Sequence, residues 1–323
     1  MSKFRVFALS LTVLLFLAGS ATAQRTVLYH SQADDGREFL VRLLLDEDGA
    51  AGSVEVKQAP QRPDAEPGLD LVVSGPVTTQ DDQAVMIFEG GSLEVPVTDN
   101  GAADPLGAGT LQLAGQPELS LHGVGMVIRG ELGSPDSRFV VSAQFPFFLR
   151  EPWAGQQLFG DAGLSRNLEE GLELFSQGAG EPWNWYQLDE MAFLTAFSSR
   201  VMSGMQVQFS FTGGAHPNTV RQTRTLLGSE YGSWYEASYL CAAVLHLGWA
   251  CDDAHVRQQV ISQLQREEAS WVVAGEVTAE TPWLLDKFVL NPNGVTIVFD
   301  PYEAGAYVEG LYLVDVPYGQ LAP

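Results

Sequence analysis

The chain has 323 residues, of which 46% are hydrophobic and 10% aromatic, so it can form about two ordered domains. Its 40 acidic and 17 basic residues give a formal net charge of −23. A surface with this charge repels nucleic acids and anionic lipids, and it attracts cationic partners. Solubility alone is the simpler explanation for the charge.

The first 23 residues have the pattern of a cleavable secretory signal peptide. Lys3 and Arg5 precede an apolar run from Val6 to Leu17, and the small residues 21–23 form an A-x-A cleavage site. The run is short for a membrane span, and no later segment has eighteen uninterrupted apolar residues. We therefore expect cleavage between Ala23 and Gln24, and a secreted or periplasmic protein without stable membrane insertion.

Residues 24–135 have the pattern of an all-β domain. Hydrophobic residues alternate from Phe39 to Leu45, and Val54 and Val56 repeat the pattern. Further short apolar runs lie at 69–73, 84–88, 93–97, 110–113 and 119–128, each bounded by Gly, Pro, Asp or Asn. This spacing predicts a small sandwich or an open barrel. His30 and His122 have no second ligand at metal-binding spacing, so we expect an adhesion or spacer module without a metal site.

A turn cluster at 133–136 predicts the boundary of a second domain, residues 136–323, with an α+β fold. Phe139–Phe148 reads as a strand, and Pro146 within it favours a strand edge or exit. Leu164–Phe175 has helical spacing. The aromatic cluster Trp183, Trp185 and Tyr186 is either a carbohydrate-stacking platform or a set of core anchors.

A predicted hairpin follows this cluster. Met191–Arg200 and Met205–Phe211 read as paired strands, with Ser203-Gly204 as the turn between them. Its second strand runs into an unusual loop, 212–218, with the sequence TGGAHPN. Adjacent glycines permit backbone angles that side chains forbid, and Pro217 biases His216 towards an extended conformation.

The last third of the chain alternates between strands and helices. Thr219–Leu227 is the expected return strand, and Gly294–Phe299 and Leu311–Val316 are expected to close the sheet. Helices are expected over 238–247 and 253–270, with a buried stripe at Val256, Val260, Ile261 and Leu264.

Cys241 and Cys251 are the only cysteines in the chain. In an oxidising compartment such a pair reads first as a disulfide, and two buried free thiols are the alternative. Ten residues of straight helix span about 15 Å, which is beyond bridging distance. A disulfide therefore requires Gly248 to end or bend the helix between the two cysteines.

The loop 212–218 and the stretch 288–318 together resemble one extracellular domain family. Its members include the extracellular domain of the lysozyme-sensing anti-sigma factor RsiV and the N-terminal part of the peptidoglycan deacetylase PdaC. The family has a T-G-G-A-H loop and a later strand pair, and the later positions matched are Phe288, Leu290, Gly294, Phe299, Pro301, Tyr302, Glu303, Gly305, Tyr307 and Gly310. The resemblance covers about residues 137–323. The sequence departs from the family at 221–224, where Arg-Gln-Thr-Arg replaces an aromatic-rich strand.

The resemblance implies a non-catalytic binding or sensing module for a cell-envelope partner, either a basic lysozyme-like muramidase or a peptidoglycan fragment. It implies no cofactor. It places the partner-binding residues in the loop and near the Pro-Tyr-Glu turn, at Thr212, Gly213, Gly214, His216, Asn218, Tyr302, Glu303 and Tyr307.

Two other functions stay open from the sequence. His216, Asp300 and Glu303, with Glu309, could form a hydrolase site for envelope glycans, since paired carboxylates suit glycoside hydrolysis. The alternative for these residues is structural: Glu303 would accept backbone N–H groups, and His216 would hold its own loop in place. The third possibility is an envelope protein with a purely structural role.

Overall fold

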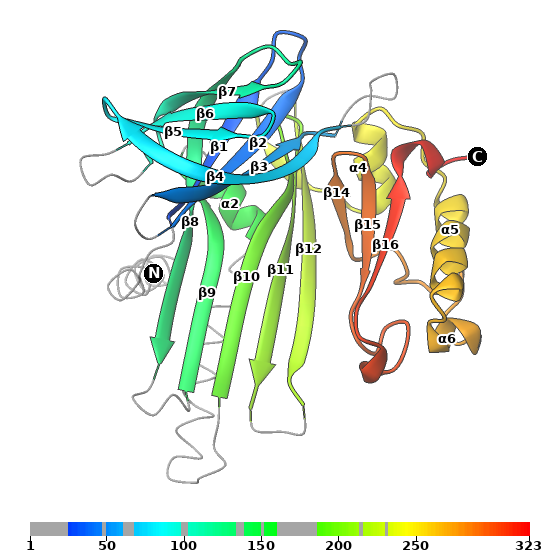
Figure 1. The fold of residues 1–323 in the computed structure, drawn as a ribbon. Helices are drawn as coiled ribbons and strands as arrows, with labels where there is room; N and C mark the ends of the chain where they lie inside the picture. The colour runs from blue at the N-terminus through cyan, green and yellow to red at the C-terminus, as the bar shows by residue number, and fades with distance from the viewer. Residues whose placement is uncertain are drawn as a thin grey trace, which may run out of the picture.

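A computed structural model describes residues 25–46, 50–60, 68–97, 103–133, 139–149, 152–159, 186–212, 216–229 and 232–323. The expected signal peptide, the helix at 164–175, Trp183, Trp185, Gly213 and Gly214 lie outside these residues. The described chain consists of a barrel, a long sheet that continues from it, and a C-terminal region of helices and a small sheet (Figure 1). No helix among the described residues is long and apolar enough to cross a membrane.

The barrel is antiparallel and closed. Its strands follow chain order, and β1 pairs with both β2 and β8, so the first and last strands meet. The interior is apolar, with Tyr29, Leu93 and Leu121 fully buried. The all-β prediction is confirmed, and the barrel is closed. Its strands are β1 Arg25–Gln32, β2 Glu38–Leu45, β3 Ala51–Gln58, β4 Asp70–Gln80, β5 Gln83–Phe88, β6 Gly91–Pro96, β7 Ala108–Leu113 and β8 Leu119–Gly133.

The sheet continues beyond the barrel, because β8 is long enough to pair with barrel strands and also with β9. Its first part pairs with β1 and β7, and residues 125–133 pair with β9 (Phe139–Phe148). The sheet continues through β10 (Tyr186–Phe197), β11 (Val201–Phe211), β12 (Asn218–Gly228) and β13 (Trp234–Glu236). One 13-stranded sheet therefore crosses the expected domain boundary.

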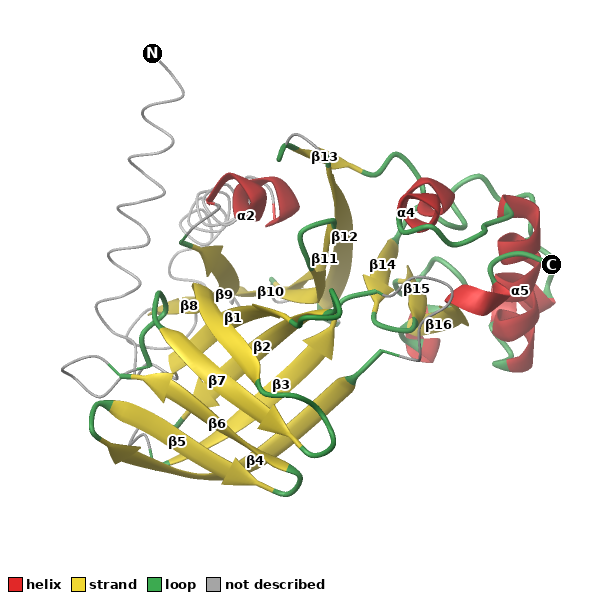
Figure 2. Cartoon of the chain, turned by 90° about the horizontal axis from the view of Figure 1, so that it is seen from above, coloured by secondary structure: helices red, strands yellow, loops and turns green. Residues whose placement is uncertain are grey.

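Pro146 lies where the sequence predicts, at an exit from the paired region. β10 pairs in parallel with β9 only as far as Gln144, so Pro146 pairs with Val127 of β8 alone. The short helix α2 (Pro152–Phe159) packs on one face of this sheet (Figure 2). Leu158 and Phe159 of this helix belong to a core that also contains Leu194.

The predicted turn of the β10–β11 hairpin is wrong. The turn lies at 198–200, and Ser203 and Gly204 lie inside β11. A side chain at Gly204 would come within 2.9 Å of the Phe159 ring and of the Phe193 carbonyl. The glycine therefore provides space for α2 and does not make a turn, since glycine in a strand often marks a close approach.

The C-terminal strands form a sheet of their own and do not close the large sheet, which corrects the prediction. β14 (Phe288–Asn291), β15 (Gly294–Phe299) and β16 (Tyr312–Pro317) are antiparallel. Two short 3₁₀ helices, η1 (Tyr307–Glu309) and η2 (Tyr318–Gln320), flank β16. β15 is buried along its whole length. The hydrophobic core around it also includes residues of β11 and β12.

Three helices complete this region: α4 (Leu240–His246), α5 (Asp253–Arg266) and α6 (Ser270–Val273). The predicted buried stripe of α5 is confirmed, and Asp252 caps that helix by accepting a hydrogen bond from the His255 N–H at 3.0 Å.

Cys241 and Cys251 form a disulfide, with Cα atoms 5.4 Å apart. The bridge is possible because α4 ends at His246 and Gly248 adopts φ +92°, as the sequence requires. The disulfide prediction is thus confirmed.

Candidate functional site

The predicted site residues lie where β12 meets the turn after β15. Two groups of side chains occupy this junction: a network of charges, and a cluster of aromatic rings that we call the aromatic row (Trp271, Tyr302, Tyr307 and His216). The contacts of the charged groups determine what the carboxylates can do.

Asp300 is the centre of the charge network. It is buried at the end of β15 and accepts hydrogen bonds from the Arg221 N–H and guanidinium, both at 2.8 Å, and from Lys287 Nζ at 2.7 Å. Lys287 also binds Glu303 at 2.6 Å, and the second oxygen of Glu303 accepts the Asp300 N–H at 2.7 Å. Two cations and two carboxylates thus neutralise one another.

The network stabilises the charged form of its lysine. Burial alone would lower the pKa of Lys287, but hydrogen bonds to Asp300 and Glu303 outweigh it and raise that pKa. The network thus favours the charged form of Lys287 between its two carboxylate partners. The predicted backbone bond of Glu303 is confirmed.

Glu309 belongs to a different set of contacts. Its oxygens accept hydrogen bonds from the N–H and hydroxyl of Ser270, the Tyr312 hydroxyl and the Ala306 N–H, at 2.6–2.9 Å. The bonds from Ser270 contribute most, and together they lower the pKa of Glu309 to about 2. Burial raises the pKa of Tyr312 to about 12, and the hydrogen bond to the negatively charged Glu309 adds to this shift.

His216 contacts none of these carboxylates among the interactions of the described residues. Its ring stacks on Tyr307 with centroids 4.1 Å apart, and its Nδ1 lies 3.0 Å from the Pro217 carbonyl oxygen. The Tyr307 hydroxyl donates to the same carbonyl at 2.7 Å. His216 and Tyr307 thus join the loop after β11 to η1. Thr212 and Asn218 are exposed at its two ends.

The aromatic row continues from Tyr307 to Tyr302 and Trp271, with centroid separations of 5.7 and 6.4 Å. Tyr302 is 53% exposed and has φ +70°, a left-handed conformation that is uncommon for a bulky residue. Val308 beside the row is 91% exposed. The row therefore presents exposed rings at Tyr302 and His216, whereas Trp271 and Tyr307 are partly buried.

The contacts of Asp300, Glu303 and Glu309 can be compared with those that glycoside hydrolysis requires. Retaining or inverting hydrolysis needs two carboxyl groups on opposite sides of the scissile bond, one of them with a raised pKa. Asp300 and Glu303 instead bind the same ammonium group, and Glu309 holds a turn. The exposed rings, by contrast, can stack on sugar faces or pack against a protein.

Sequence reasoning missed the two cations of the network. Arg221 lies in the stretch 221–224 where the sequence departs from the family pattern, yet it is the partner of Asp300. The two-residue period of the expected strand 219–227 places Arg221 on one face together with Thr219 and Thr223, but no sequence feature places Asp300 opposite it.

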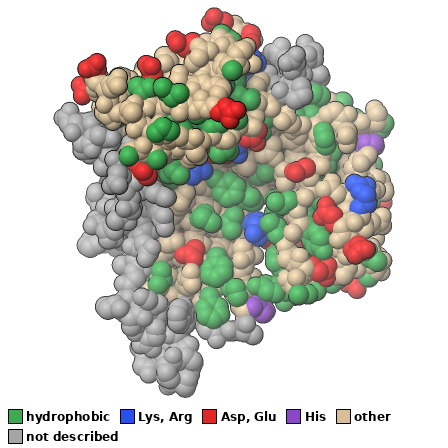
Figure 3. Space-filling view, in the orientation of Figure 1, with side chains coloured by type: hydrophobic (Ala, Val, Ile, Leu, Met, Phe, Trp, Pro, Cys, Tyr) green, Lys and Arg blue, Asp and Glu red, His purple; other side chains and the backbone are tan. Residues whose placement is uncertain are grey.

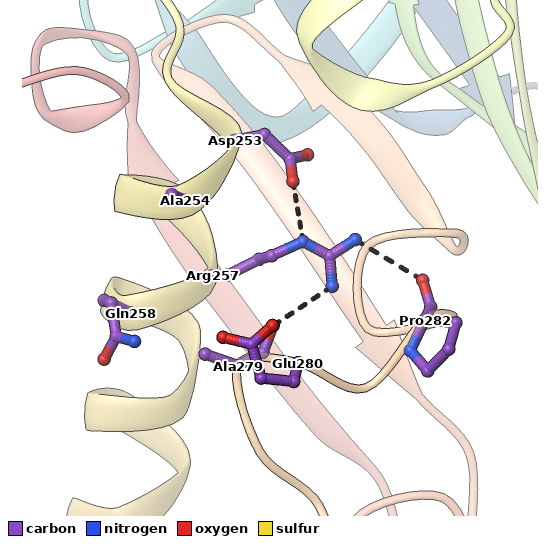
Figure 4. Close-up of a pocket in the computed structure, with 7 residues that line it drawn as sticks. All are labelled: Asp253, Ala254, Arg257, Gln258, Ala279, Glu280 and Pro282. Carbon is purple, nitrogen blue, oxygen red and sulfur yellow. Dashed lines mark hydrogen bonds and ion pairs between the residues drawn. The ribbon is translucent and has the colours of Figure 1, made fainter.

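A shallow pocket of about 270 Å³ lies apart from the junction, between the start of α5 and the loop before β14 (Figure 4). Arg257 is among the residues that line it and extends from α5 towards the loop. The guanidinium donates to Asp253 at 2.7 Å and to the carbonyls of Ala279, Thr281 and Pro282. Its donors are thus used to fix a loop, and the pocket offers no free cation. The described residues contain no group of three or more His, Cys, Asp or Glu that could hold a metal.

The fold and site define a mostly β protein with a barrel, a C-terminal α+β region and an exposed aromatic surface. Residues 253–319 match the family described as "Protein of unknown function (DUF3298)". This match supports the coarser part of the predicted resemblance, in the region that contains the Pro-Tyr-Glu turn and the aromatic residues from Trp271 to Tyr307.

Two solved structures of DUF3298 proteins are similar to this chain at low identity. One, from Bacteroides fragilis, is 10% identical with a TM-score of 0.37, covering 60% of this chain and 89% of its own. Another, from Pseudomonas aeruginosa, is 14% identical with a TM-score of 0.36, covering 61% and 90%. A comparison with curated proteins gave no match.

Proposed function

We propose that this chain is an exported, non-catalytic binding module for a cell-envelope partner, and that the aromatic row is its binding surface. The observation that carries the proposal is Tyr302, which is exposed and has a left-handed backbone. Such a conformation costs about 1–2 kcal/mol for a residue other than glycine. Strain of this kind often accompanies function, and here it holds a ring towards solvent.

Envelope glycan is the partner that the row fits best. Sugar rings have apolar faces that pack on aromatic rings, and Tyr302 presents an exposed ring in a row whose neighbouring centroids are 4.1–6.4 Å apart, with His216 stacked on Tyr307. The adjacent charges cancel in the Asp300 network. A neutral ligand would therefore meet no unpaired charge from that network.

A basic muramidase is the second candidate, and the net charge of −23 favours it. A long-range field of this sign accelerates encounters with cationic proteins, and salt screens the effect. Such a partner could use the same aromatic surface, since Tyr and Trp are common anchors at protein interfaces.

The test is calorimetric titration of the mature protein with chitotetraose and, separately, with a c-type lysozyme at low and at about 150 mM salt. We expect Tyr302→Ala to weaken binding of the true partner at least about 10-fold, or about 1.4 kcal/mol. Tyr239→Ala is the matched control, because Tyr239 is 56% exposed and lies outside the row. We expect it to leave binding unchanged.

Tyr302→Gly separates binding from folding. Glycine accepts φ +70° without strain, so we expect this variant to be about 1 kcal/mol more stable than Tyr302→Ala while binding equally poorly. Equal binding by wild type and both variants would contradict the proposed surface. Turnover of chitotetraose by wild type would show a hydrolase instead.

A further inference from the structure

One face of β10 and β11 has a continuous set of apolar side chains. We call it the apolar strip: Met191, Phe193, Met205, Val207, Phe209 and Phe211. The strand register places these residues together, because Met191 pairs with Val207, Phe193 with Met205, and Asp189 with Phe209. The same face of β12 contains Arg221, which pairs with Val207 and reaches the C-terminal region through Asp300.

The apolar strip is unusual because solvent can reach its hydrophobic side chains. The opposite face of β11 has Gln206, Gln208 and Ser210, and α2 packs on that opposite face at Gly204. Met191 is 48% exposed, and the other five side chains are only partly buried. Hydrophobic side chains gather in the hollow over these strands, between the barrel and the C-terminal region (Figure 3).

The shape of the strip limits what it can bind. Four alternating residues of β11 span about 20 Å, and two strands are about 10 Å wide. β10 and β11 are paired with strands on both sides, so they have no free edge to which a peptide strand could add. A ligand must therefore pack its own apolar surface on the side chains.

Polar groups border the strip on both sides. On the β9 side, the Asp189 carboxylate accepts hydrogen bonds from Ser142 at 2.6 Å and Gln187 at 2.7 Å, and it has no cation partner among the described ion pairs. On the β12 side, Thr219 and Thr223 flank Arg221, whose charge Asp300 neutralises. Of the charges described here, only that of Asp189 is left uncompensated at the borders, and the whole chain has a charge of −23.

We propose that the apolar strip binds a cationic amphipathic helix of a partner protein. An α-helix is about 10–12 Å in diameter, and about 14 residues of it span 20 Å, so its apolar stripe matches the strip in both dimensions. Lys or Arg beside that stripe would lie next to Asp189. Methionine and phenylalanine suit such a surface, because methionine adapts its shape and aromatic rings bury a large area.

The probe is a fluorescein-labelled peptide of about 16 residues with leucine on one helical face and lysine on the other. Fluorescence anisotropy measures its binding to the full chain. We expect Met191→Lys to weaken binding at least about 10-fold, and Asp189→Asn about 3-fold. Ile87→Lys is the matched control, since Ile87 is a 67% exposed hydrophobic residue of the barrel. It should have no effect, and neither should Tyr302→Ala.

Four results would overturn the proposal. The first is no binding of the peptide, and the second is equal binding of a peptide with the same composition in scrambled order, which would show charge attraction alone. The third is Met191-dependent binding of laurate without binding of the peptide, which would make the strip an acyl-chain site. The fourth is a dimer in sedimentation that Met191→Lys converts to a monomer, which would assign the strip to a second copy of the chain.

Discussion

At the scale of single residues, the most instructive side chain is Glu309. The Pro-Tyr-Glu region and η1 form irregular backbone, and such backbone needs partners for its N–H groups. Glu309 supplies two oxygens to four donors and so fixes η1 against the start of α6. This contact positions Trp271 near Tyr302, and it is therefore a support of the aromatic row.

The low pKa of Glu309 predicts the pH dependence of stability. A carboxylate with a lowered folded-state pKa stabilises the fold above its unfolded pKa of about 4.5, and that contribution is lost as pH falls towards about 2. We expect Glu309→Gln to lower the urea midpoint at pH 7 and to lower it much less near pH 2.5. A constant difference at both pH values would contradict this role.

At the scale of elements, the charge network joins β12 of the large sheet to β15 of the small one. The side chain of Asp300 is 7% exposed and that of Arg221 is 15% exposed, so water compensates neither charge fully. A buried ion pair contributes little net stability, but removal of one partner leaves a buried charge without compensation. The pair thus specifies how the two sheets pack.

Removal of Asp300 should therefore be costly. We expect Asp300→Asn to reduce the free energy of unfolding by about 3 kcal/mol, because Arg221 and Lys287 lose their common counter-ion. Urea denaturation measures the loss. The double variant Asp300→Asn, Arg221→Met should recover part of it, and strict additivity of the two single effects would argue against direct coupling.

At the scale of the whole molecule, the barrel and the rest of the chain are joined by the sheet and by side-chain contacts. Glu38 of β2 accepts the N–H and hydroxyl of Ser199, in the β10–β11 turn, at 2.7 and 2.6 Å, and its carboxylate lies 2.9 Å from His30. Burial alone would raise the pKa of Glu38, but these hydrogen bonds outweigh it and lower that pKa. At a second contact, the Asn293 side chain donates to the Gly68 carbonyl at 3.1 Å.

These contacts predict that the described regions unfold together. Hydrogen bonds to a charged group contribute about 1.5–3 kcal/mol, so Glu38→Gln should lower the free energy of unfolding by about 2 kcal/mol. For this variant, we expect the unfolding transition followed by tryptophan fluorescence and the one followed by far-UV circular dichroism to shift by the same amount. The seven tryptophans of the chain lie between Trp153 and Trp283, after the barrel strands in sequence. A shift of the circular dichroism transition alone would mean that the barrel unfolds independently.

The local features of this protein could be predicted from its amino-acid sequence alone. Hydrophobic alternation and short apolar runs located the barrel strands β2 to β8 but not β1, which closes the barrel. The stripe of α5 followed from its 3.6-residue period, and Gly248 between two cysteines made the disulfide possible. Features that depend on residues far apart in the chain could not be predicted and became clear from the fold. Gly204 reads as a turn until Phe159 is placed against it, and Arg221 is unexplained until Asp300 lies opposite. Local patterns report burial and backbone preference, whereas a charge pair or a shared sheet face depends on register between strands far apart in the chain.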